Sequence, residues 1–211
     1  MIMSAEIWTS IIQTVAVVVA SGAAIWGVNS WRREAEWKRK YELAEEVLSL
    51  FYDAEERFDI IRSPVSNSGE GKTRKKGENE TPDDSDDLDN AYIVPERIEK
   101  EKALFNKLKA LKYRFQAIFG EESVKPFNEI EGHLMEIQLA NIRLHRQYYP
   151  AQNNNNYTEE QFERHLKDMH ENEAIIWTGF DVTDKFQESV KNTISKIEGI
   201  CKPIIQNRVR K

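Results

Sequence analysis

The chain has 211 residues, of which 40% are hydrophobic and 31% are charged, and its formal net charge is −6. This length favours one domain, or one domain plus an appendage, and the mild acidity offers no basic face of the kind that nucleic-acid binding requires. The single cysteine, Cys201, excludes an internal disulfide framework and a cysteine-rich zinc site. Because the chain is mildly acidic, we expect no nucleic-acid partner.

An uncharged apolar segment lies near the N-terminus of this otherwise hydrophilic chain. Residues 7–31 contain no charged side chain, although the mean hydropathy of the whole chain is −0.65. A helix over residues 7–28 would be about 33 Å long, enough to cross a hydrocarbon core of about 30 Å. No Lys or Arg precedes the segment, and it is longer than the apolar part of a signal peptide. We predict a transmembrane helix at 7–31, rather than a cleaved signal or a buried soluble helix.

Aromatic and basic residues flank this span as they do at a membrane interface. Tryptophans lie at both ends, and basic residues follow the span only: Trp8, Trp26, Trp31, Arg32, Arg33, Trp37, Lys38, Arg39 and Lys40. The positive-inside rule then places residues 1–6 outside and residues 32–211 in the cytoplasm of a single-pass inner-membrane protein. A contact of the basic residues with anionic lipid is a second, less favoured interpretation.

Small residues recur at four-residue spacing within the span in two parallel series, the first of Ala16, Ala20 and Ala24 and the second of Ala23 and Gly27. In lipid, a face of small residues lets two helices approach closely, so a homo-oligomer formed through the membrane helix is one hypothesis. The alternative is that Ala and Gly are simply common in membrane helices.

The rest of the chain predicts helices that follow one another along the sequence. The membrane helix is expected to continue to Arg62, since no Pro or Gly interrupts residues 31–62. A second helix is expected to start near Pro95 and end at Gly120, and a third to start at Pro126 and end near Pro150.

The last two helices carry capping signals in the sequence. Thr158 and Gln161 form a capping box, and Asp184 can cap the final helix. No stretch alternates as a strand does, and the apolar residues of the helices recur at the three-four spacing of coiled coils. The fold class expected is therefore all-α: a single transmembrane helix that continues into an antiparallel cytoplasmic helical bundle over residues 32–211.

Residues 65–90 break the helical pattern and are expected to form a disordered loop. They contain a single Val, a single Leu and no aromatic residue, so they bury too little apolar surface to offset their ordering entropy. The first half of the loop is basic and the second half is acidic. The acidic half lacks the spacing of a calcium-binding EF-hand loop.

No catalytic, cofactor-binding or metal-binding motif is found. The four histidines reproduce neither H-E-x-x-H nor paired E-x-x-H spacing, and there is no glycine-rich phosphate loop. Cys201 lies on an apolar helical stripe, which indicates a core cysteine rather than a nucleophile. Asn141 is a polar residue on an apolar stripe, where it either fixes the register of the helices or lies at the edge of the stripe.

The pattern favours a non-enzymatic, membrane-anchored helical interaction or scaffold module that binds the lipid bilayer and an unidentified protein partner. One alternative is an oligomerising membrane effector that perturbs the bilayer through Thr9, Gln13, Thr14 and Ser21. A second alternative is an enzyme that lacks recognisable motifs, which a deep pocket with convergent polar groups would favour. No cofactor is expected.

Overall fold

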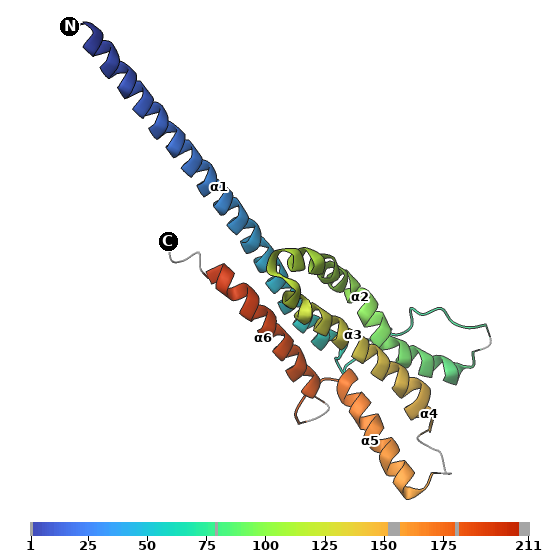
Figure 1. Ribbon diagram of the computed structural model, residues 1–211. Coiled ribbons are helices and arrows are strands. Elements are labelled where there is room, and N and C mark those ends of the chain that lie inside the picture. Colours follow the sequence, from blue (N-terminus) through green and yellow to red (C-terminus); the bar gives the residue numbers. More distant parts are fainter. Residues whose placement is uncertain (1, 79, 152–156, 180–181, 207–211) are drawn as a thin grey trace. The chain divides into compact units, whose positions relative to one another are not determined.

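The structure, a computed structural model, describes residues 2–78, 80–151, 157–179 and 182–206. Every regular element among these residues is a helix, which confirms the prediction of an all-α chain (Figure 1). In chain order the elements are α1 (Ile2–Ile61), α2 (Pro82–Phe119), the 3-10 helix η1 (Glu121–Val124), α3 (Lys125–Arg143), the π-helix η2 (Leu144–Tyr148), α4 (Tyr149–Ala151), α5 (Glu159–Ile176) and α6 (Lys185–Gln206).

The chain divides into two compact units, residues 1–44 and residues 45–211, which are described separately. The first unit is the N-terminal part of α1. This helix runs without interruption to Ile61, as the absence of Pro and Gly from residues 31–62 predicts. The N-terminal apolar helix and the first polar helix are therefore one element.

An aromatic core holds the second unit together. The Phe127 ring lies 5.0 Å from Phe51 and 5.3 Å from Phe115, and the Phe58 ring lies 5.8 Å from Phe186. These five rings come from α1, α2, α3 and α6, and all are buried. Such ring pairs contribute about 0.5–1.5 kcal/mol beyond the burial of their area.

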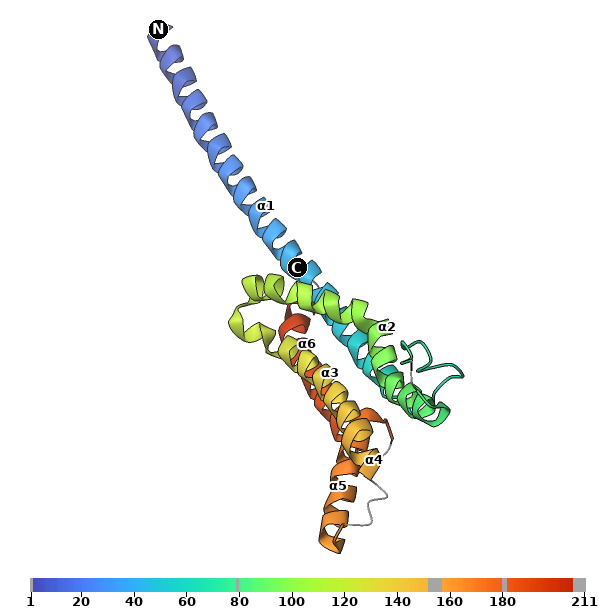
Figure 2. The ribbon, with the colours of Figure 1, turned by 90° about the vertical axis from the view of Figure 1, so that its right-hand side faces the viewer.

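The apolar stripes of the sequence fall mostly on this core. The apolar stripe residues that are buried include Val47, Phe51, Phe58, Leu108, Phe115, Ile130 and Ile137. Leu111 and Leu134 belong to the same apolar stripes but are only half-buried. The helix α3 contacts α2, α5 and α6, and in Figure 2 it runs alongside α6.

The helix α2 begins earlier than the sequence pattern predicts. It starts at Pro82 rather than near Pro95, so the expected loop over residues 65–90 is wrong for residues 82–90, which are helical. Thr81 is the N-cap: its hydroxyl accepts a hydrogen bond from the Asp84 amide, and Asp84 accepts one from the Thr81 amide. This capping box and the proline in the first turn start the helix without an apolar stripe.

The remaining connection, residues 63–81, is held to α2 by ion pairs. Arg74 donates to both carboxylate oxygens of Glu80, at 2.7 and 2.6 Å, and to Asp89 at 2.6 Å. Arg97 on α2 donates to Glu70 at 2.8 Å, and the Glu96 carboxylate accepts from the Gly71 amide at 2.6 Å. The basic half of the expected disordered loop therefore pairs with the acidic half, which composition alone did not indicate.

Pro95 lies inside α2 and leaves one carbonyl without its helical donor. Proline has no backbone N–H, so the carbonyl of Ala91, four residues earlier, loses its usual hydrogen bond. The buried side-chain amide of Asn141 on α3 donates to that carbonyl at 3.1 Å. Asn141 is therefore buried between the helices, and its amide compensates for the proline.

The end of α1 is fixed by a buried arginine. Arg62 is fully buried and donates to the carbonyls of Ile175 at 2.7 Å and Ala174 at 2.9 Å, in the last turn of α5. It also donates to Asp184 at 2.9 Å. The Asp184 carboxylate in turn accepts from the Gln187 amide at 2.9 Å, as the cap predicted for α6 requires. One side chain thus joins α1, α5 and the start of α6.

Candidate functional site: an apolar helix with a basic flank

The apolar segment predicted at residues 7–31 lies entirely within α1. Among the described residues α1 is the one helix that is long and apolar enough to cross a membrane. The side chains of residues 8–29 are all exposed, including Val17, Val18 and Val19 at 65% each. Exposed apolar surface of this extent is unfavourable in water, so the segment needs a covering that its own unit does not supply.

A polar side chain in this segment is satisfied within the helix. The Thr14 hydroxyl donates to the carbonyl of Ser10, one turn earlier, at 2.8 Å. A hydroxyl bonded in this way can face hydrocarbon without leaving its donor unpaired. The Thr14 side chain is therefore compatible with an apolar environment.

The predicted interface residues fall into two kinds. Most of them are exposed: Trp8, Trp26, Trp31, Arg32, Arg33, Lys38, Arg39 and Lys40. Trp37 is half-buried, because its ring packs on Tyr41, one turn further along, with 5.3 Å between the ring centroids. Lys38 forms an i,i+4 ion pair with Glu42 at 3.8 Å.

The small residues predicted for self-association share one side of the helix. Ala16, Ala20 and Ala23 line a shallow apolar hollow along α1 together with larger apolar side chains: Trp8, Ile11, Ile12, Val15 and Val19. Ala24 and Gly27 lie further along the helix and are exposed, and a Cβ atom at Gly27 would meet nothing within 4 Å. The small side chains of this face thus leave room for the close approach of another helix.

A mixed groove of about 690 Å³ lies beside the π-helix in the second unit. Its lining residues are Arg74, Asp87, Leu88, Asn90, Ala91, Tyr92, Asn141, Ile142, His145, Arg146, Tyr149 and Pro150. Burial lowers the pKa of His145, which keeps the imidazole neutral near pH 7, and raises the pKa of Tyr149 to about 12. This groove was not predicted, because a three-four spacing of apolar residues does not reveal a π-helix.

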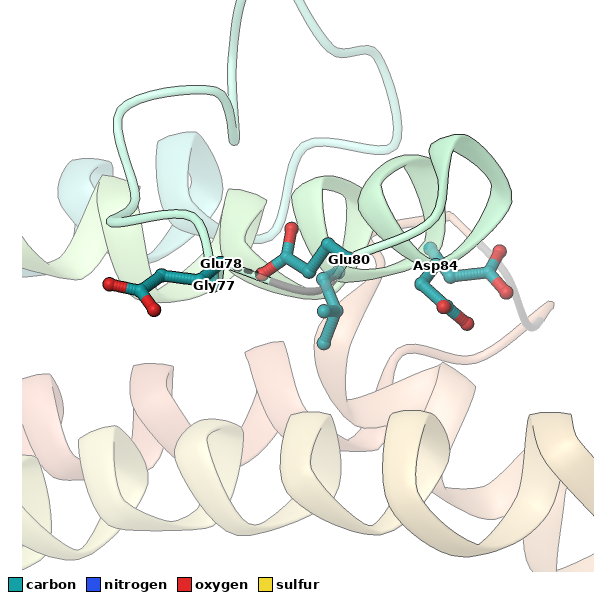
Figure 3. A pocket seen from close by; sticks show the side chains of 6 residues that line it. Gly77, Glu78, Glu80 and Asp84 are labelled. Carbon is teal, nitrogen blue, oxygen red and sulfur yellow. Dashed lines mark hydrogen bonds between the residues drawn. The ribbon is translucent and has the colours of Figure 1, made fainter.

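A second hollow lies at the start of α2 and is acidic. Figure 3 shows the side chains of Glu78, Glu80 and Asp84 spread around it rather than converging on one point. The Arg74 guanidinium beside Glu80 lowers the pKa of that carboxyl to about 2. No cluster of three or more potential metal ligands occurs in the part of the chain that the structure describes.

The other candidate reactive groups are held in the core. Cys201 is buried, and burial raises the pKa of its thiol to about 12. His133 is buried with its Nε2 atom 3.2 Å from the Thr193 hydroxyl, which donates to Glu129 at 2.9 Å. These contacts join α3 to α6 and satisfy buried polar atoms of both helices.

The chain was compared with protein-family models, with curated proteins and with solved structures, and no match was found in any of the three comparisons.

Proposed function

We propose that the protein is a single-pass membrane protein whose N-terminal helix anchors a cytoplasmic helical module at the inner membrane. The observation that carries the proposal is the exposed, uncharged face of α1 over residues 8–29. Burying this face in hydrocarbon removes it from water, and a helix satisfies its own backbone hydrogen bonds there.

The asymmetry of charge around the segment supports an orientation with the N-terminus outside. Five basic residues follow the segment within ten positions of Trp31, and Glu6 is the only charged residue before it. Under the positive-inside rule this asymmetry keeps residues 32–211 in the cytoplasm. The exposed side chains of Arg32 and Arg33 are free to lie among the lipid headgroups at that boundary.

We further propose that residues 45–211 serve as an interaction or scaffold module, with their helices arranged as an antiparallel bundle. The aromatic core and the buried Arg62 contacts join helices that are far apart in the sequence, as a rigid binding module requires. At one of the four semi-polar positions an anchor is favoured over a bilayer-perturbing effector, because the Thr14 hydroxyl is satisfied by Ser10 and needs no aqueous lining there. A second copy can pack against the small residues at Ala16, Ala20 and Ala23.

The orientation is tested with reporter fusions after Lys211. A reporter that is active only in the cytoplasm should give signal, and a phosphatase that is active only after export should give none. In a matched variant, the five basic residues become Gln and five Lys residues are placed before Ile7, which should reverse both results. Phosphatase activity in the unaltered chain would contradict the proposed orientation.

A further inference from the structure

One face of α3 is apolar and yet exposed. Met135, Leu139 and Ile142 have 61%, 45% and 46% of their surface exposed and follow one another at four-residue and three-residue spacing. On the opposite side of the same helix, Ile137 and Ala140 are fully buried. A single exposed apolar residue needs no explanation, but three along one helical stripe indicate a surface that contacts something.

Opposite charges lie at the two ends of this stripe. Glu131 precedes Met135 by one turn on α3, and Arg146, in the π-helix η2 that continues α3, follows Ile142 by four residues. Arg146 is exposed and makes no ion pair with any residue that the structure describes. The Glu131 carboxylate lies 3.4 Å from Lys112, and its side chain is still 45% exposed. A helix face that is acidic at one end and basic at the other is complementary to itself when a second copy is turned end to end.

We infer that the α3 stripe, defined as Glu131, Met135, Leu139, Ile142 and Arg146, binds the same stripe of a second copy of this chain in antiparallel orientation. When the two-fold axis passes between positions 138 and 139, Met135 faces Ile142 of the second copy. Glu131 faces Arg146 of the second copy, and each of these contacts occurs twice. A parallel arrangement would instead place like charges opposite each other at both ends, which is unfavourable.

The size of the stripe makes this contact weak between free molecules. The helix from Glu131 to Arg146 is about 22 Å long, so the stripe covers a few hundred Å² per copy, less than the roughly 800 Å² per partner of a standard interface. Tethering both copies to one bilayer raises their effective concentration and favours the contact. Only this last step depends on the proposed membrane anchor.

Thiol crosslinking of the full chain in phosphatidylcholine vesicles tests the orientation. In a Cys201→Ser background, Met135→Cys and Ile142→Cys chains carry different tags and are mixed before reconstitution. A bifunctional thiol reagent shorter than about 10 Å should join position 135 to position 142. It should join identical positions far less, since these are separated by about 10 Å along the antiparallel helices.

The control is a Lys191→Cys chain, since Lys191 is exposed on α6. Its crosslinking measures the non-specific background. Predominant crosslinks between identical positions would overturn the antiparallel orientation. Crosslinking no greater than that of Lys191→Cys would show that the stripe does not bind a second copy. Flotation of the vesicles reports the anchor separately, so a failed crosslink with intact flotation counts against the α3 stripe alone.

Charge reversal tests the pairing at the ends of the stripe. Glu131→Arg or Arg146→Glu alone should lower the dimerisation constant, measured by energy transfer between labelled chains in vesicles, by about ten-fold. The combined variant E131R/R146E restores opposite charges across the two-fold axis and should recover most of the association. Circular dichroism checks that each variant remains folded. Equal losses in the single and combined variants would overturn the proposed pairing.

Discussion

Replacing Arg62 by Met should destabilise the second unit strongly. The change removes the donor to the carbonyls of Ala174 and Ile175, at 2.9 and 2.7 Å, and to Asp184 at 2.9 Å. Met keeps much of the apolar contact with Phe186, whose ring lies 4.3 Å from the guanidinium carbon. Removing one partner of a buried ion pair costs about 3–5 kcal/mol. Because the Asp184 side chain is 22% exposed and can be rehydrated, we expect the lower end of that range.

The measurement is a urea titration of the full chain in mild detergent, followed by far-UV circular dichroism. Arg57→Met is the matched control on the same helix, because Arg57 is 35% exposed and pairs with Glu101 at 3.4 Å. A partly exposed pair of this kind contributes about 1 kcal/mol, so the control should change the free energy of unfolding much less than Arg62→Met. If Arg62→Met and Arg57→Met lower the free energy of unfolding equally, Arg62 does not hold these helices together.

Three further predictions concern Asn141, the pairing of Arg74 with Glu80, and Cys201. Asn141→Ala should cost about 1–3 kcal/mol, and less in a Pro95→Ala background, where the carbonyl regains a backbone donor. A double-mutant cycle in urea measures this coupling, and equal losses in both backgrounds would refute it. Arg74 lowers the pKa of Glu80 from 4.5 to about 2, so this pairing stabilises the fold above pH 4.5 and is lost as the pH falls towards 2. As the pH falls from 4.5 towards 2, the melting temperature of the unaltered protein should fall more steeply than that of Arg74→Gln. Parallel curves of melting temperature against pH for the two proteins would exclude the pairing. Burial raises the pKa of Cys201 to about 12, so maleimide should label it at mildly alkaline pH only after unfolding in urea. Rapid labelling of the folded chain would show that the thiol is accessible.

Local signals in the sequence predict several helix ends correctly. Gly120 ends α2 with a positive φ of 90°, and Pro126 lies in the first turn of α3. The Thr158 capping box starts α5, and Asp184 caps α6. Each of these signals acts within a few residues of its own position, so the sequence reveals it directly.

The start of α2 was missed although its signals are present in the sequence. Thr81, Pro82 and Asp84 form a cap, a first-turn proline and a capping box, but no apolar stripe follows them at once. Apolar content, which is low over residues 65–90, does not predict a helix there. Pairing of Arg74 with Glu80 and other acidic residues stabilises this region instead, and composition does not show which charges will meet.

Contacts between distant segments were beyond the reach of the sequence. Arg62 meets Ile175 across 113 positions, and Asn141 meets Ala91 across 50. Both contacts depend on how the helices pack, which the three-four spacing leaves open. The candidate membrane segment was predictable, because twenty-five uncharged residues form a local property of the chain and need no partner to be recognised.

Alkaline extraction of cell membranes tests the central claim most directly. The full chain and a control with Val17→Leu and Val19→Leu should both stay with the membranes. A variant with Val17→Asp and Val19→Asp should be released or fail to insert, since each Asp near the centre of a span costs about 2.5–3.5 kcal/mol. Release of the unaltered chain into the alkaline supernatant, or its solubility without detergent, would contradict the membrane anchor.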